Sequence, residues 1–366
     1  MKNQPYIQSM LPVLPLKKCR QISSQLDAEA VHLKAEEFIK GIDLTKPQDI
    51  RPELGTAVEA MLKDEIPPFD VTRFITTVAD LALENAVENA LEKCGPAPAG
   101  WMYMLMGSEG RTEQTLRTDQ DSAIVYEEGD HQEYFIELGS FVSRRLNDLG
   151  FLFCKGNVMA SNPKWVMKAA DWEKAFTRWV DEPEPLAVMQ SCIFFDLRCG
   201  LGEKEFESGL RDHISKLLGS QSGLFFYHMA QNALKHSVPL GWFGGLSQSS
   251  KTQLDIKKAM LPIVDHARIY VLKNGIEKTN TRERIIALME QKSYKGSDAE
   301  DALAALEFFN GLRLRHQVEQ LKNGADPDNE INPSILDKQS RDDLIFCLKL
   351  SKNLQQNIGL NFRAGY

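Results

Sequence analysis

The sequence predicts an α+β fold in which a small mixed core lies between two helical regions. Apolar residues recur at helical spacing toward both ends of the chain, whereas short continuous apolar runs of strand length fall within residues 99–202. The chain has 366 residues, more than one ordinary core accommodates, and its 43% hydrophobic and 26% charged residues are typical of a globular protein. We therefore expect an N-terminal helical region at 1–98, the mixed core at 99–202 and a C-terminal helical domain at 203–366.

Two helices are predicted in the N-terminal region. Residues 24–40 carry apolar side chains at helical spacing, and Gly41 supplies a stop. A longer apolar stripe runs over residues 71–94 and ends at Gly95, which precedes a proline. The first hundred residues thus read as a helical unit.

The pattern changes at Trp101, where a continuous apolar and aromatic run begins. Four strands are predicted, at residues 101–106, 121–126, 151–154 and 191–197, with helices near 131–149 and 171–180. Trp165, Trp172 and Trp179 recur every seven residues, a spacing for which core packing on one helical face is the usual reason. From residue 203 onward the pattern is almost wholly helical, with breaks rich in Gly, Ser, Asn and Pro.

Charge and cysteine usage limit the partners. The formal charge is -8, and no run of Lys and Arg is long enough to follow a phosphate backbone, so we expect no long nucleic acid as a partner. The six cysteines include no CxxC pair, and we expect reduced thiols. No segment has the roughly 20 apolar residues of a membrane span, so we expect a cytoplasmic protein without a membrane partner.

A glycine-containing turn follows the first predicted strand. Gly107, Ser108 and Gly110 are small enough to let backbone N–H groups approach phosphate oxygens, and Arg111 comes directly after them. Glycine turns after strands are common, so this motif is weak evidence by itself.

Three carboxylates complete the candidate site. Asp119 and Asp121 stand at positions i and i+2 at the start of a strand, so both would project to one side, where a divalent cation would offset their repulsion. A turn element is the alternative. Asp196 is the single acid in the apolar run 191–197; it could be neutralised by Arg198 or join the other two around metal, and a neighbouring-strand arrangement favours the metal.

Three such carboxylates beside a phosphate-binding turn suit two-metal phosphoryl transfer. We expect Asp119 and Asp121 to bind both ions, and Asp196 to bind the ion on the hydroxyl side and act in catalysis.

The segment from Gly107 to Asp121, GSEGRTEQTLRTDQD, resembles the signature of the PII uridylyltransferases and glutamine synthetase adenylyltransferases. It is more similar still to a bacterial nucleotidyltransferase family often fused to cyclic-nucleotide-binding and CBS domains. That resemblance extends over roughly residues 70 to 360 and includes IFFDLR and LDIKKAMLPIVDHARIYVLKNGI. The hundred N-terminal residues are too short and too helical for a CBS pair, so a stand-alone form is expected.

The resemblance implies a polymerase-β-like nucleotidyltransferase core followed by a helical substrate-binding domain. It implies an enzyme of the uridylyltransferase or adenylyltransferase type that acts in signal transduction. Such an enzyme transfers a nucleoside monophosphate from ATP or UTP to a hydroxyl acceptor, such as a protein side chain, with Mg²⁺ or Mn²⁺. The residues expected to bind the nucleotide are Gly107, Ser108, Arg111, Thr118 and Lys257.

Alternatives remain open for several side chains. Lys257, Asp265 and Arg268 could instead form a solvated charged face, and Glu113 is expected to give structural support. His228 and its polar neighbours at helical spacing are expected to form helix surface rather than a metal site. A non-catalytic nucleotide sensor and a partner-binding scaffold are the rival functions.

Overall fold

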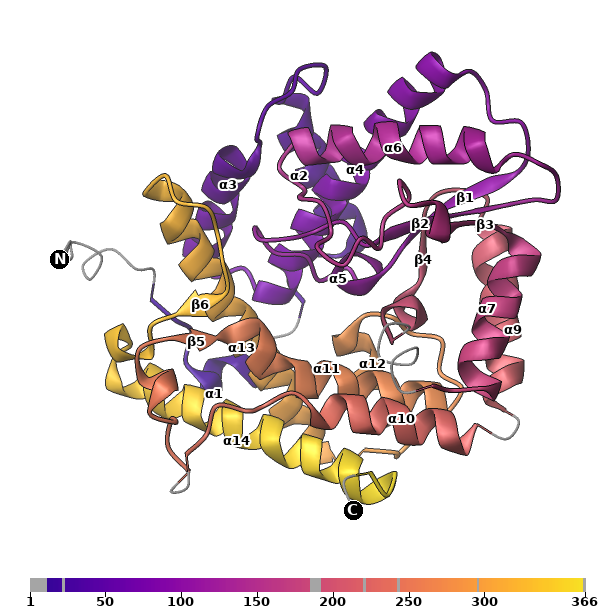
Figure 1. Ribbon diagram of the computed structural model, residues 1–366. Helices are drawn as coiled ribbons and strands as arrows, with labels where there is room; N and C mark the ends of the chain where they lie inside the picture. Colours follow the sequence, from indigo (N-terminus) through magenta and orange to yellow (C-terminus); the bar gives the residue numbers. More distant parts are fainter. Residues whose placement is uncertain are drawn as a thin grey trace.

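The computed structural model describes residues 12–21, 24–184, 192–219, 222–241, 244–294 and 296–364. Helices from the two ends of the chain enclose a small sheet (Figure 1). This arrangement agrees with the α+β class predicted from the sequence. Among the described residues, no helix has both the length and the hydropathy to cross a membrane.

Three N-terminal helices form the first layer: α2 (Ala28–Lys40), α3 (Arg51–Lys63) and α4 (Pro68–Cys94). The short helix α1 (Leu16–Cys19) instead packs against the C-terminal helix α13 (Gly296–Lys322). The side chain of Asp27 caps α2 by accepting a hydrogen bond from the Ala30 amide. Gly95, with a φ of +84°, ends α4. The two predicted helices are confirmed, and α4 packs against α2, α3 and the core helix α6 (Gln132–Asp148).

The central sheet has four strands in the order β3, β2, β1, β4. Their bounds are β1 (Trp101–Leu105), β2 (Ser122–Tyr126), β3 (Val166–Lys168) and β4 (Arg198–Gly202). Strand β1 is antiparallel to β2 and β4, and β2 is parallel to β3. Leu105 pairs with Ser122, which brings the residues after β1 beside those before β2.

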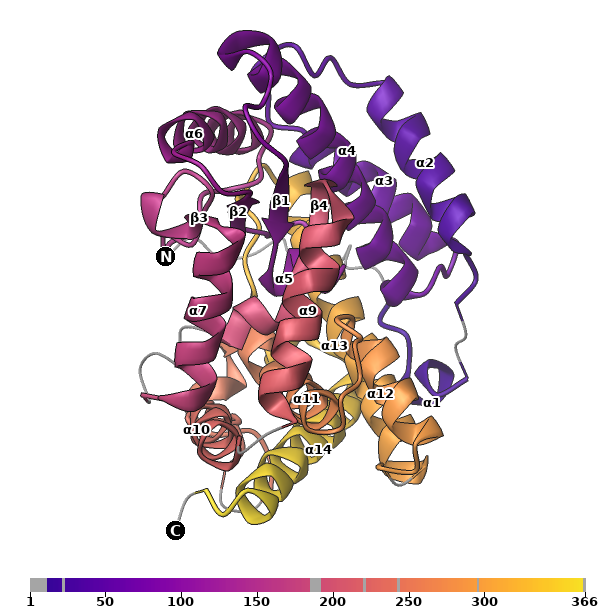
Figure 2. The same cartoon turned by 90° about the vertical axis from the view of Figure 1, so that its right-hand side faces the viewer.

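Helices cover both faces of the sheet, which explains the continuous apolar run of β1. Tyr103 and Ile124 face α4 and α6 (Gln132–Asp148), whereas Met104 and Val125 face the opposite cluster. That second face is covered by α7 (Ala169–Asp181) and α9 (Lys204–Leu218), which lie side by side in Figure 2. The buried Trp172 and Trp179 lie on α7, as the core interpretation predicted.

The predicted strand over residues 191–197 is wrong. Residues Cys192–Asp196 form the 3₁₀ helix η2, strand β4 starts only at Arg198, and Ser191 lies outside the described residues. The tight helix lets Phe194 pack on Trp165, with ring centroids 4.7 Å apart, while Phe195 packs on Phe225 of α10 (Gly223–Leu234). A short apolar run does not distinguish such a turn from a strand. The predicted strand over 151–154 is reduced to one bridge, between Asp119 and Leu152.

The C-terminal region is a bundle of helices that contacts both other regions. Its helices are α10 (Gly223–Leu234), α11 (Ile256–Lys273), α12 (Thr281–Glu290), α13 (Gly296–Lys322) and α14 (Lys338–Asn361). Strand β5 (Leu254–Asp255) directly precedes α11 and pairs with β6 (Glu330–Ile331), which follows α13. Helix α13 packs against α3 and α4, so the two helical regions meet.

Gly139 provides a test of the packing between α6 and the loop before β3. A Cβ there would lie 2.1 Å from the Ala160 carbonyl oxygen. We predict that Gly139→Ala lowers the free energy of unfolding by about 1–3 kcal/mol, because backbone must move. Gly209→Ala, on α9 with open space around it, should be neutral or stabilising by up to about 1 kcal/mol. Urea midpoints that shift equally in both variants would contradict this packing.

Candidate active site

The glycine turn predicted to approach phosphate lies directly against the aspartate pair. Residues Gly107–Gly110 form the short helix α5, and Gly107 has a φ of +58°. A Cβ on Gly107 would lie 2.3 Å from Asp121 Oδ2, and one on Gly110 would lie 2.1 Å from the Asp196 carbonyl oxygen. Both positions therefore require glycine, because any side chain would collide with backbone or with the acid.

Asp119 and Asp121 lie just before β2, on either side of Gln120. The Gln120 side-chain amide is buried and donates to the carbonyl oxygens of Ser143 (2.9 Å) and Phe151 (2.8 Å). Because side chains alternate along extended chain, this inward anchor turns both aspartates to the other side. The Met106 amide donates to the Asp121 carbonyl oxygen at 2.9 Å, which fixes the pair beside the glycine turn.

The electrostatics of the pair show two acids in a confined space. Burial and the charge of Asp119 raise the pKa of Asp121 to about 6, while Cys154 and Lys257 act in the opposite direction. Burial and the Asp121 charge raise the pKa of the Cys154 thiol to about 11, so this thiol remains a protonated donor. The Asp119 carboxylate accepts no hydrogen bond from any described residue.

Lys257 brings an opposing charge from the C-terminal region. It lies in the first turn of α11, which is capped by Asp255 through the Lys258 amide at 3.0 Å. Burial lowers the pKa of Lys257, and the charges of Asp119 and Asp121 oppose that shift. Within the described chain the Lys257 ammonium has no hydrogen-bond or ion-pair partner. The neighbouring Lys258 is exposed and pairs with Asp255 at 3.0 Å.

Two charged residues near the pair were missed by sequence reasoning. Burial raises the pKa of Glu109, in the glycine turn, to about 8, and the charges of Asp80, Asp121 and Asp119 add to the rise. Arg313 on α13 is 4% exposed and has no carboxylate partner among the described residues. In the sequence, Arg313 is recognisable as a charged residue among the apolar residues of a predicted helix. Its spacing does not identify the groups that it contacts.

Arg313 holds the loop between α5 and β2 through neutral groups. Its guanidinium donates to Thr115 Oγ1 (3.1 Å), Asn329 Oδ1 (3.2 Å) and Asn310 Oδ1 (3.4 Å). Burial lowers its pKa to about 10. Thr118 in the same loop is buried, and its hydroxyl accepts a hydrogen bond from Gln114 at 3.1 Å.

Asp196 occupies a different environment, a buried cluster of arginines. Its Oδ2 lies 2.7 Å from Arg111 Nη1 and 2.7 Å from Arg268 Nη2, and its Oδ1 lies 2.8 Å from Arg284 Nη2. Burial by itself would raise the pKa of Asp196, but Arg268, Arg284 and Arg111 hold it well below its usual range. The carboxylate is fully buried and ionised.

The structure therefore does not bring Asp196 together with Asp119 and Asp121 as the sequence predicted. Both of its oxygens are engaged by guanidinium groups, which leaves no position open for a cation. No group of three or more His, Cys, Asp or Glu side chains in the described ranges is placed to hold a metal ion. Arg198, which was the alternative partner for Asp196, instead pairs with Asp80 at 2.9 Å.

Further buried side chains pair with the arginines around Asp196. Arg111 Nε donates to Glu113 at 2.8 Å, and Glu113 accepts the Thr281 amide at 2.5 Å, which agrees with the predicted structural role of Glu113. Asp265 and Arg268 on α11 pair at 2.6 Å and are 8% and 5% exposed, so they do not form a solvated face. The cluster thus joins the glycine turn to α11 and α12.

Comparison with protein families identifies two domains in the chain. Residues 52–186 match the family described as "Putative nucleotidyltransferase DUF294", and residues 223–362 match its "Putative nucleotidyltransferase substrate binding domain". The first range contains the glycine turn and the aspartate pair, and the second contains Lys257, Arg268 and Arg313. A search of curated proteins finds no match.

The arginine cluster predicts a large stability cost for Asp196→Asn. Removing one partner of a buried ion pair typically costs about 3–5 kcal/mol, because the remaining charges lose their compensation. Chemical denaturation of the purified protein measures this loss. Asp212→Asn, an exposed change on α9, should alter the free energy of unfolding by less than about 0.5 kcal/mol. A stable Asp196→Asn protein would show that the arginines do not depend on this carboxylate.

Proposed function

We propose that this chain, which carries a nucleotidyltransferase domain and its substrate-binding domain, transfers a nucleoside monophosphate from a triphosphate to a hydroxyl acceptor. The observation that carries the proposal is the half-buried ammonium of Lys257, which pairs with no described residue and acts electrostatically on Asp119 and Asp121 from the other domain. The Lys257 ammonium and the two carboxylates face one another without forming an ion pair. A metal-bound triphosphate would neutralise both, because its metal binds the carboxylates and its phosphate oxygens bind the ammonium.

The aspartate pair suits Mg²⁺ or Mn²⁺. Two carboxylates are what protein commonly supplies to Mg²⁺, with substrate phosphates and water completing the coordination. Gly107 leaves the space beside Asp121 that a side chain would fill. A divalent cation held there would neutralise charge on the phosphates during transfer. Asp119 and Asp121 are the residues that we assign to it, and Asp196 is not part of this proposal.

The remaining residues have positioning roles in the proposal. Lys257 neutralises phosphate oxygens, while Gly107 and Ser108 let the ligand approach the backbone. Arg313 and Thr118 hold the loop that carries the aspartates. Arg111 was expected to contact nucleotide, but its guanidinium is committed to Glu113 and Asp196, so we assign it to fixing the turn.

The proposal also includes the chemical class of the acceptor and of the donor. By likeness to the PII uridylyltransferases, the acceptor hydroxyl belongs to a protein side chain, and the donor is UTP or ATP. Thermal-shift measurements with each of the four nucleoside triphosphates and Mg²⁺ would identify the donor, because a ligand of the native state raises the melting temperature.

A nucleotide sensor is the second candidate function. It is favoured by the engagement of Asp196 with arginines, which leaves two carboxylates where a full two-metal site was expected. Pyrophosphate release distinguishes the two functions. Release of pyrophosphate from one of the triphosphates supports transfer. Triphosphate binding without pyrophosphate release, whichever acceptor is added, supports sensing.

The first functional prediction concerns Asp119. Asp119→Asn should abolish metal-dependent nucleotide binding, because one of the two metal-binding carboxylates is lost, while circular dichroism and the melting temperature stay close to those of the native protein. Isothermal titration calorimetry with Mn²⁺ and triphosphate measures the loss. Asp130→Asn, an exposed carboxylate outside the site, serves as control. Unchanged binding by Asp119→Asn would refute the assignment.

The second concerns Lys257 and its neighbour. Lys257→Gln should weaken triphosphate binding by about 10- to 100-fold, the loss of one charge-assisted contact. Lys258→Gln removes the same charge one residue away, from an exposed side chain that pairs with Asp255, and should leave affinity within about twofold. If both substitutions weaken triphosphate binding equally, Lys257 makes no specific contact with the ligand and only the total positive charge at the start of α11 contributes.

A further inference from the structure

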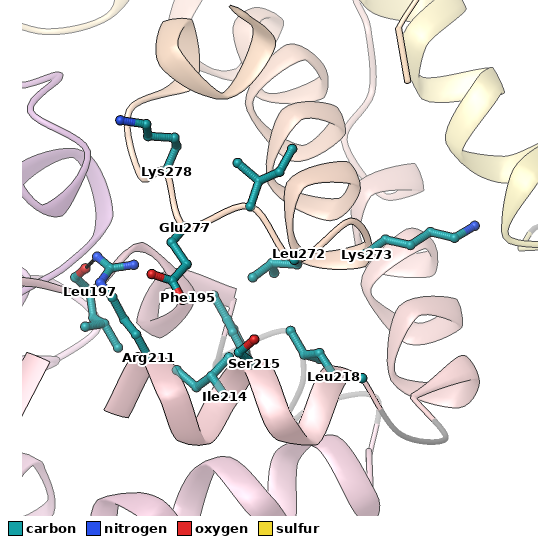
Figure 3. A pocket seen from close by; sticks show the side chains of 13 residues that line it. Phe195, Leu197, Arg211, Ile214, Ser215, Leu218, Leu272, Lys273, Glu277 and Lys278 are labelled. Atoms are coloured by element: carbon teal, nitrogen blue, oxygen red, sulfur yellow. Dashed lines mark hydrogen bonds between the residues drawn. The ribbon is translucent and has the colours of Figure 1, made fainter. Parts of the chain in front are cut away.

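A separate cavity opens between η2, α9 and the turn that joins α11 to α12 (Figure 3). Its volume is about 190 Å³. Six of its 13 lining residues have apolar side chains: Phe195, Leu197, Ile214, Leu218, Leu272 and Ile276. No residue assigned to the nucleotide site lines this cavity, so the proposed function does not use it.

Glu277 is the one acidic residue that lines this cavity, and its side chain is exposed. Its carboxylate lies between Phe195 and Arg211, whereas the side chains of Lys273 and Lys278 extend away from the cavity (Figure 3). Glu277 forms neither an ion pair nor a hydrogen bond with any described residue. The Ser215 hydroxyl lies on the opposite wall.

The cations of the rim are all engaged elsewhere. Arg211 bonds to Glu207 at 2.8 Å and donates to the Leu197 carbonyl. Lys278 lies 3.7 Å from the Glu283 carboxylate. Lys273 stacks its ammonium on the Phe362 ring, 4.8 Å from the centroid. The cavity therefore presents apolar walls and one uncommitted negative charge.

Hydrogen bonds and ion pairs of Arg284 link the cavity wall to the glycine turn. Its Nε donates to the Lys278 carbonyl at 2.7 Å and its Nη2 to the Phe195 carbonyl at 3.4 Å, so it touches two lining segments. The same guanidinium pairs with Asp196, which pairs with Arg111 directly after the turn. Its Nη1 is buried without a partner. A shift of the cavity wall would thus move a side chain that holds the turn.

We propose that this cavity is a regulatory site for a small primary amine with a compact apolar body. The ammonium pairs with Glu277, and the apolar body packs against Phe195 and Leu218. The volume is comparable to an apolar cavity of about 150 Å³ that accepts benzene, so a ligand of about six to eight non-hydrogen atoms fits. Binding of the amine shifts the cavity wall and thereby alters the contacts among Arg284, Asp196 and Arg111. This regulatory part of the proposal rests on the proposed nucleotide site.

The binding half is tested by calorimetry on the full chain with three probes of one shape: 3-methylbutylamine, 3-methylbutanol and 4-methylpentanoate. The amine should bind saturably with a Kd of about 1 mM, as its size allows, and the alcohol at least about tenfold more weakly. Glu277→Gln should weaken the amine by about tenfold, whereas Glu290→Gln, which changes an exposed acid at the end of α12 away from the cavity lining, should not. Tighter binding of the carboxylate, no binding, or an unaffected Glu277→Gln protein overturns the proposal.

The regulatory half is tested by linkage. The Kd of the triphosphate with Mn²⁺ is measured with and without saturating amine, and the Kd of the amine with and without triphosphate. Both should change by the same factor, of at least about threefold, because coupling between two sites is reciprocal. Amine binding with no change in triphosphate affinity overturns the coupling. Amine binding by a protein that binds no triphosphate leaves the site intact and refutes the proposed function instead.

Discussion

The fold is built around one buried carboxylate that three arginines share. Asp196 has no exposed surface, and its charge is balanced by Arg111, Arg268 and Arg284. Charges taken out of water cost several kcal/mol each unless their geometry is nearly ideal, so such a cluster tolerates little movement. Because Arg111 belongs to the glycine turn, Arg268 to α11 and Arg284 to α12, the cluster fixes the nucleotidyltransferase domain against the substrate-binding helices.

This constraint determines where the proposed chemistry takes place. Helix α11 carries Arg268 near its middle and Lys257 in its first turn, so anchoring the helix at Asp196 also places the ammonium within reach of the aspartate pair. Arg313 makes the second connection, from α13 to the loop before β2. The proposed nucleotide site is therefore composite: its two aspartates come from one domain and Lys257 comes from the other.

Much of this could be predicted from the sequence, where local signals agreed with the tertiary structure. The strand before Gly107, the strand after Asp121 and the long helix ending at Gly95 each have a continuous pattern and a clear stop. The run 191–197 failed because consecutive apolar residues suit a strand and a tight turn equally, and the packing of Phe194 and Phe195 decided between them. The partners of Asp196 lie 72 to 88 residues away along the chain or on other helices, so spacing could not identify them.

The composite site is tested most directly by crystals grown with Mn²⁺ and a non-hydrolysable triphosphate, using anomalous scattering to locate the metal. We expect an anomalous peak between Asp119 and Asp121, with a phosphate oxygen at Lys257 and the arginines still around Asp196. A peak at Asp196 with its arginines displaced, or a triphosphate bound away from Lys257, would contradict the composite site.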